Sequence, residues 1–238
     1  MIMDTPLFDI HLINGNITLF IGAHTEPFKK DILNSSLLGE LASISKQSNS
    51  KELLWADYVD TVGKIGWIIK SREFKRQEFP TKCLLKIVEL GMGSLLSKEE
   101  KQTLATAFSQ LKKTEGHSSA IKSFLDKLHT NAFVANEETT APGSTQSPVA
   151  TSTRLTLITH NASIITLQVA FKTRDGIGID ILDQPLLDTI KDGNTNLWLM
   201  VSSLDARQYE NVRATVIKKI GNRINTDLLQ VAKSACPV

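Results

Sequence analysis

The five histidines are the side chains of this sequence best suited to bind a metal ion or to move a proton near neutral pH. They are His11, His24, His117, His129 and His160. No two of them lie two or four positions apart, the spacing that brings two imidazoles to one face of a strand or helix. We therefore predict no metal and no cofactor, and we interpret the histidines as surface or half-buried residues. A meeting of His11 with His24 near the first turn of the chain stays open.

Two cysteines are the candidates for nucleophilic or redox chemistry, Cys83 and Cys236. Cys83 falls in the first turn of a predicted helix, where the helix dipole favours a thiolate. Two leucines follow it, however, which favours a position facing the core. Two thiols are too few for a zinc site or a disulfide framework. We expect both to be reduced in a cytoplasmic setting, with a Cys83–Cys236 bridge as the alternative.

Two glycine pairs resemble the start of a phosphate-binding loop, in Gly91–Ser94 and Gly176–Gly178. Such a loop joins a strand to the N-terminus of a helix, so that backbone N–H groups meet the phosphate. A predicted helix precedes the first pair, and predicted strands flank the second. Both are therefore predicted to be turns. No G-x-S-x-G elbow occurs either, and we assign no catalytic residue.

Four acids near the end of a predicted strand could attract a cation. They are Asp180, Asp183, Asp188 and Asp192. The commoner role of such residues is to keep a loop soluble. We therefore predict no metal ligand here either.

The formal net charge of +2 is too small to indicate a nucleic-acid partner. Basic residues gather in two sets, which we interpret as solvated helix faces, with contact to acidic lipid as the alternative. The sets are Lys70, Arg72, Lys75 and Arg76, and Arg207, Arg213, Lys218, Lys219 and Arg223. An aromatic stripe of Trp55, Tyr58 and Trp67 is typical of a core, although it would also suit membrane insertion.

The elements that must position these residues begin with a hairpin. Asn14-Gly15 is the preferred pair for a type I′ turn, and apolar residues alternate on both sides of it. Helical spacing then predicts helices over residues 25–44, 54–69, 82–90, 97–115 and 118–128. The first has a possible break at Ser35-Ser36, and Ser97 with Glu100 forms a capping box. Gly63 and Gly66 inside the second predict close approach of a neighbouring helix.

Residues 136–153 are rich in Thr, Ser, Pro and Gly, which predicts a linker or long loop. In one alternative, residues 132–135 and 155–159 pair across it. Strands are then predicted over 155–157, 165–171, 177–182 and 197–201. Asp205 caps a final amphipathic helix, Gly221-Asn222 marks a break in it, and apolar residues continue at helical spacing beyond the break to Val231.

These elements predict an α+β protein. An N-terminal hairpin and a layer of four to six helices fill residues 1–135, a linker covers 136–153, and a small antiparallel sheet closed by the last helix covers 154–238. The chain is one domain overall if the hairpin joins that sheet.

We expect a cytoplasmic protein, because the N-terminus lacks a basic signal region and no apolar run approaches the roughly 20 residues of a membrane helix. The leading hypothesis is a non-catalytic protein-interaction or self-assembly protein that uses an exposed strand edge. The second is a membrane-active toxin or effector released without a signal peptide. The third is an enzyme with a dispersed site.

Overall fold

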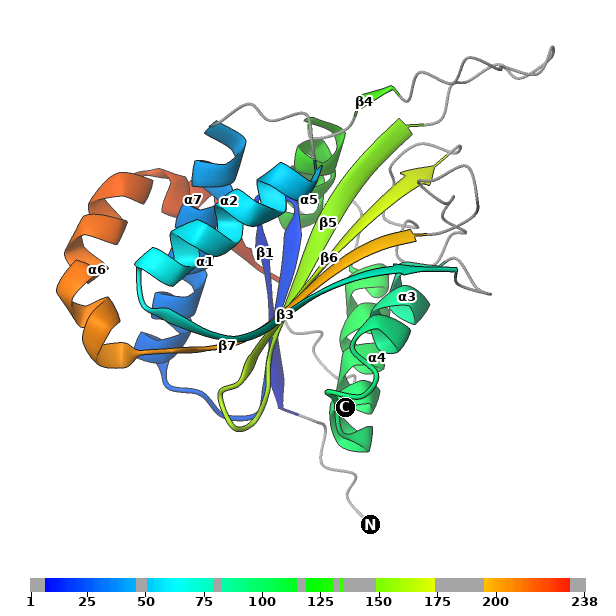
Figure 1. Cartoon of the computed structure of the whole chain (residues 1–238), viewed down its shortest axis with the longest axis horizontal. Coiled ribbons are helices and arrows are strands. Elements are labelled where there is room, and N and C mark those ends of the chain that lie inside the picture. The colour runs from blue at the N-terminus through cyan, green and yellow to red at the C-terminus, as the bar shows by residue number, and fades with distance from the viewer. Residues whose placement is uncertain are drawn as a thin grey trace.

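The computed structural model describes residues 7–45, 51–78, 83–114, 119–130, 133–134, 149–173 and 195–231 (Figure 1). The strands are β1 (Phe8–Ile13), β2 (Asn16–Ile21), β3 (Trp67–Gln77), β4 (Phe133–Val134), β5 (Val149–Ile158), β6 (Ile164–Thr173), β7 (Thr195–Leu204) and β8 (Leu228–Gln230). The helices are α1 (Glu26–Ser45), α2 (Lys51–Lys64), α3 (Leu84–Gly91), α4 (Lys98–Lys113), α5 (Ser119–Thr130), α6 (Ala206–Ile220) and α7 (Arg223–Asp227). The chain therefore mixes helices and strands, as an α+β protein does.

One sheet contains all the described strands, in the order β3-β7-β6-β5-β2-β1-β8, with β4 beside β5. Strands β1 and β2 form a hairpin whose turn residues, Asn14 and Gly15, both have positive φ. The β2–β5 pair is parallel and the other pairs are antiparallel. The sheet is thus larger than the small antiparallel sheet that the sequence predicts, and it is mixed. The alternation of apolar and polar residues identifies each strand but does not indicate which strand it pairs with.

Helices cover both faces of this sheet, so they form two layers and not the single layer that we expected. Alternate strand residues such as Leu19 and Leu167 pack with α3, α4 and α5. Their neighbours, such as Phe20 and Met200, pack with α1, α2 and α6. Figure 1 shows α3 and α4 on the opposite side of the sheet from α1, α2 and α6. In the described part of the chain, no helix has both the length and the apolar character needed to cross a bilayer.

The second helix is shorter than its apolar spacing predicts, which is a correction. We expected it to continue through Ile69, but α2 ends at Lys64 and β3 begins at Trp67. Gly66 between them has φ +105°, which L side chains rarely adopt, and its backbone lies against that of Tyr209. The basic set from Lys70 to Arg76 therefore lies on a strand, not on a helix face.

The close approach of a helix predicted at Gly63 and Gly66 is found at Gly66, where a Cβ atom would lie 3.1 Å from the backbone nitrogen of Tyr209 in α6, and also at Gly39, but not at Gly63. A Cβ atom on Gly39 of α1 would lie 2.8 Å from the ring of Tyr58 on α2. A Cβ atom on Gly63 would meet only Ile69, at an ordinary 3.6 Å. Helix α1 also runs unbroken through Ser35, whose hydroxyl donates to the carbonyl of Asp31 at 2.7 Å.

Two predicted caps are confirmed. The amide of Glu100 donates to Ser97 Oγ at 3.1 Å, and the amide of Ser97 donates to Glu100 Oε2 at 2.9 Å, which is a complete capping box for α4. At the start of α6, the side chain of Asp205 accepts from two backbone amides. Both caps involve residues two or three positions apart, so they form independently of the tertiary contacts of the helix.

The break predicted at Gly221-Asn222 is confirmed, but the helical spacing predicted beyond it does not continue as a helix to Val231. After α6 and the short α7, Leu228–Gln230 form β8 and pair with β1. Helix α6 packs against α1, where the guanidinium of Arg213 donates to both carboxylate oxygens of Asp31, at 2.9 and 2.8 Å. Leu228 and Val231 therefore belong to a strand and its end, although their spacing also fits a helix.

The Thr- and Ser-rich segment is shorter than the predicted linker. Strand β5 already begins at Val149, and residues 149–150 pair with β4. The two sides of this segment therefore do pair, although residues 155–159 pair with β6 and not with 132–135. Residues 135–148 lie outside the described part.

Candidate interaction edge and neighbouring cavities

Strand β3 ends the sheet and, among the described strands, pairs only with β7. It is 11 residues long. The side chains of Ile68 and Phe74 are 50% and 58% exposed, and the residues between Lys70 and Phe74 are all exposed. A long edge strand with open backbone N–H and C=O groups is a template for pairing with another extended chain.

A bulge divides β3 into two parts. The register with β7 shifts between Ile69 and Ser71, which leaves Lys70 outside the ladder. Because one extra residue reverses the alternation, Arg72 and Phe74 lie on the same face of the sheet as Ile69. Their partners on β7 belong to the core beneath α2. The bulge thus directs a cation and an aromatic ring toward α2.

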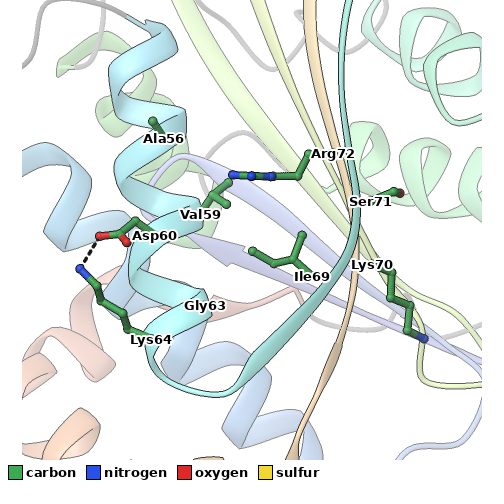
Figure 2. A pocket seen from close by; sticks show the side chains of 9 residues that line it. All are labelled: Ala56, Val59, Asp60, Gly63, Lys64, Ile69, Lys70, Ser71 and Arg72. Atoms are coloured by element: carbon green, nitrogen blue, oxygen red, sulfur yellow. Dashed lines mark hydrogen bonds and ion pairs between the residues drawn. The ribbon is translucent and has the colours of Figure 1, made fainter.

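A groove of about 700 Å³ runs between α2 and β3 (Figure 2). We call it the β3 groove. Its lining residues are Ala56, Val59, Asp60, Gly63, Lys64, Ile69, Lys70, Ser71 and Arg72. Figure 2 shows Arg72 extending toward Val59 and Lys70 pointing away from α2. On the α2 side, Lys64 Nζ lies 2.6 Å from Asp60 Oδ2, so these two charges compensate each other.

The edge is positively charged. Between positions 70 and 76, four cations and one anion leave a net charge of +3. Glu73 lies 2.9 Å from Lys75, which neutralises one of the four. Neither Lys70 nor Arg72 has a hydrogen-bond or ion-pair partner among the described residues. Both side chains are exposed.

A buried polar cluster lies at the centre of the sheet, on the α1 and α2 side. Arg154 of β5 forms an ion pair with Glu40 of α1, and both side chains are 7% exposed. Arg154 Nε donates to Gln168 Oε1 at 2.8 Å, and its guanidinium lies 4.2 Å from the centre of the Tyr58 ring. Burial raises the pKa of Glu40, while Arg154 opposes that shift. Because its groups satisfy one another, this cluster joins layers and offers no free reactive group.

A second cavity lies near the other end of the sheet, beneath α1. Its volume is about 630 Å³, and we call it the α1 pocket. Its lining residues are Asp9, His11, Glu26, Lys29, Lys30, Leu33, Asn34, Ile217, Ile224, Leu228 and Gln230. They come from β1, α1, α6, α7 and β8, so the pocket exists only in the assembled fold.

His11 is the unusual member of the α1 pocket. It is 7% exposed, and neither ring nitrogen has a hydrogen-bond partner in the described part of the chain. Burial lowers the pKa of His11 to about 4; the nearby Asp9 carboxylate opposes this shift, and the Lys29 ammonium adds to it. An imidazole that is neutral throughout the physiological range is a poor proton acceptor. The described residues that line the pocket include no Ser, Thr, Cys or Tyr.

The other predicted histidines do not converge with His11. His24 lies on the far side of Phe20, whose ring contacts both imidazoles, at 5.7 Å from His11 and 5.8 Å from His24. His160 is exposed in the turn after β5, 3.8 Å from Glu100. Among the described residues, no group of three His, Cys, Asp or Glu could hold a metal ion. His117 lies outside those residues.

The remaining candidates are structural where they are described. Cys83 is the half-buried N-cap of α3, and Gly91 ends that helix with Met92 as its C-cap. Trp55, Tyr58 and Trp67 are buried, with ring centres 6.3 and 6.4 Å apart in that order, so they form core. Cys236, the second glycine pair and the four acids from Asp180 to Asp192 lie outside the described residues.

Sequence reasoning missed the bulge at Lys70 and the pair between Glu40 and Arg154. The bulge leaves no composition signal, because it is a matter of register with β7. Arg154 did leave one: a lone cation in an alternating strand indicates either an exposed face or a buried ion pair. Its partner Glu40 lies on a helix more than a hundred positions away, which no local pattern reveals.

The described residues thus form a three-layer α+β protein in which β3 is a basic strand that pairs on one side only among the described strands. Neither the protein-family models nor the curated proteins include a match to this sequence. Solved structures similar to it include a delta-endotoxin, at 10% identity and a TM-score of 0.37, over 79% of this chain and 80% of that chain. The Evf virulence factor is similar at 9% identity and a TM-score of 0.33, over 90% and 82%. Resemblance at this level supports no conclusion about this chain.

Proposed function

We propose that this chain is a non-catalytic interaction protein whose strand β3 binds an extended, acidic segment of a partner protein. The observation that carries the proposal is the long, exposed and positively charged edge formed by β3. Strand addition satisfies the outer backbone groups of an edge strand and places alternate side chains of the partner on the two faces of the sheet. One of those faces opens onto the β3 groove.

Charge selects the partner. Arg72 points into the groove and has no ion-pair partner among the described residues, so carboxylate side chains on the groove side of an added strand would meet it. Lys70 points away from α2 and adds positive charge at the same edge. A second copy of β3 would instead bring a second cationic strand against the first. Like charges directly opposite each other destabilise a strand pair, and charged bulged edges are a known defence against self-association. The proposal therefore favours a partner of opposite charge over self-assembly.

A binding measurement with a designed peptide tests this proposal. The probe is an alternating valine–glutamate octapeptide, and its control is the matching valine–lysine peptide. We expect the acidic peptide to bind and the basic one not to bind, and the affinity to fall as salt is raised. Absence of saturable binding by the acidic peptide would overturn the proposal, as would equal binding of both peptides.

Two charge-reversal variants locate the binding. The double variant Arg72→Glu/Lys75→Glu places acids on the edge. It is expected to weaken binding of the acidic peptide by about tenfold or more. Lys218→Glu/Lys219→Glu changes the net charge equally on the exposed side of α6 and is the matched control. If both variants weaken binding equally, attraction is a matter of net charge and the edge has no special role.

Contact with an anionic membrane surface is a second candidate, favoured by the exposed Phe74 and Ile68 beside basic residues. Aromatic and aliphatic side chains next to cations suit the boundary between lipid headgroups and acyl chains. Co-sedimentation with phosphatidylserine vesicles tests it, with phosphatidylcholine vesicles as the control. Binding to the anionic vesicles that Phe74→Ser abolishes, together with no binding of the acidic peptide, would replace the first candidate by the second.

A further inference from the structure

The α1 pocket contains a buried polar side chain without a partner, and we propose that it binds a small amphiphilic molecule with an uncharged hydrogen-bonding head and an apolar tail. This inference is independent of the function proposed for β3, which lies at the opposite edge of the sheet. The volume of about 630 Å³ lies within the usual range of small-molecule sites.

The polar end of the site is formed by His11, Gln230 and Asn34. His11 and Gln230 are cross-strand partners in the β1–β8 pair, and both line the pocket. The His11 ring stands edge-on to Phe20, with ring planes at 85°, which limits its orientation. A neutral imidazole offers one N–H donor and one acceptor nitrogen, and each amide offers both kinds of group. Buried groups of this kind are normally satisfied, so both His11 nitrogens call for a bound partner.

The four charges that line the pocket, on Asp9, Glu26, Lys29 and Lys30, sum to zero, and Lys30 is exposed, so we expect them to disfavour a charged head beside the buried His11. Lys29 Nζ lies 2.8 Å from Asp9 Oδ2 and 2.5 Å from Glu26 Oε1, so one ammonium already occupies both carboxylates. A ligand cation would be repelled by the Lys29 ammonium. A ligand anion would gain little from that ammonium, because two carboxylates already neutralise it. The lowered pKa of His11 also keeps its ring uncharged above about pH 4. An amide, an alcohol or a protonated acid fits these constraints.

The apolar wall of the site suits an aliphatic tail. Leu33 of α1, Ile217 of α6, Ile224 of α7 and Leu228 of β8 line the pocket. Ile217 is 42% exposed, which is unusual for an isoleucine on a helix that packs against the body of the protein. A tail laid along this wall would cover part of that surface.

Hexanamide is the probe, because its head carries both a donor and an acceptor. We expect it to bind in the millimolar range of about 1–10 mM. In isotope-labelled protein, it should shift the imidazole resonances of His11 and the methyl resonances of Ile217 and Ile224. Hexanoate and hexylammonium have the same tail with charged heads, and we expect each to bind at least about tenfold more weakly. Equal binding of all three would overturn the assignment of an uncharged head.

Two variants and one control complete the test. His11→Phe removes the donor and acceptor and is expected to weaken hexanamide binding by about tenfold. The control His24→Phe lies outside the pocket and should leave the affinity for hexanamide unchanged. Ile224→Trp fills the pocket from its wall without changing His11 and should also abolish binding, which keeps the test valid if His11→Phe does not fold. The site contains water only, and the proposal fails, if hexanamide gives no saturable shift or if neither variant affects its binding.

Discussion

The two faces of the sheet differ in chemistry although they belong to the same strands. The face beneath α3, α4 and α5 is lined by aliphatic residues such as Leu157 and Leu167, which are fully buried. The face beneath α1 and α2 includes the Arg154–Glu40 ion pair and the unpartnered His11. The β3 groove and the α1 pocket both lie on this second face.

This difference separates a stabilising face from a recognising one. An apolar face can be closed by any helices of suitable shape, and it supplies stability through burial alone. A polar face must satisfy its groups, and the groups it leaves open at its edges are available to other molecules. Both of our proposals therefore lie where the second face reaches an edge of the sheet.

The largest effect is expected from breaking the buried ion pair. Glu40→Leu leaves Arg154 charged, buried and unpaired, which should cost about 3–5 kcal/mol in the free energy of unfolding. The double variant Glu40→Leu/Arg154→Leu removes both charges and should recover most of that loss. Chemical denaturation measures both. If the double variant is no more stable than Glu40→Leu, the pair does not behave as a coupled buried unit.

On the apolar face, the corresponding change is Leu167→Ala. It deletes a fully buried side chain and should cost about 2–5 kcal/mol through lost burial and the resulting cavity. Since no titrating group is involved, the loss in free energy of unfolding should be the same at pH 4.5 and pH 7, within about 0.5 kcal/mol. A pH-dependent loss would show that the two faces are not chemically distinct.

His11 should make the stability of the polar face depend on pH. Its pKa is about 4 in the folded protein, against 6.5 for the free side chain. The unfolded chain therefore binds a proton as pH falls below 6.5, which the folded chain accepts only near pH 4. Stability should decline by up to about 3 kcal/mol across that window. The groups facing the ring, Asp9, Glu26 and Lys29, contribute equally to the parent protein and to His11→Phe.

Comparing those two proteins isolates the contribution of His11. The difference in their free energies of unfolding, measured by denaturation between pH 4 and pH 7.5, should grow in favour of His11→Phe as the pH falls. A difference that stays constant over this range would contradict the buried, neutral state of His11.

Two glycines in the α1–α2 layer provide a smaller, matched comparison. Gly39→Ala would place a Cβ atom 2.8 Å from the Tyr58 ring and should cost about 1–3 kcal/mol. Gly63→Ala meets only Ile69 at 3.6 Å and lies in a helix, so it should stabilise by about 0.5–1 kcal/mol. Thermal unfolding measures both, and equal effects would refute the close contact at Gly39.

Local chemistry was readable from the sequence, and its assembly was not. The capping box of Ser97 and Glu100 and the cap at Asp205 involve neighbours in the chain, so residue types located them. The sequence did not predict that α2 ends before Gly66, because the apolar spacing continues across this residue. The end of α2 is explained by the packing of α6 against the Gly66 backbone. The α1 pocket draws on five elements, and the partner of each strand depends on the whole fold. Neither site could be located before the chain was folded.

The smallest effect on stability is expected at the edge. Arg72→Ala changes an exposed side chain and should alter the free energy of unfolding by less than about 0.5 kcal/mol. Phe74→Ala also removes the ring contact with its cross-strand partner Trp198, at 5.5 Å between ring centres, and should cost up to about 1 kcal/mol. Denaturation curves measure both, and a loss larger than these values would assign that side chain to the core.

Hydrogen exchange of the β3 amides, with and without the acidic peptide, tests the central claim most directly. Residues of an edge strand alternate between N–H groups that bond the neighbouring strand and N–H groups that face outward. We predict that the peptide slows exchange at the outward-facing amides of residues 67–77 and leaves exchange in β8 unchanged. Unchanged exchange in β3 while the peptide is bound would contradict strand addition at this edge.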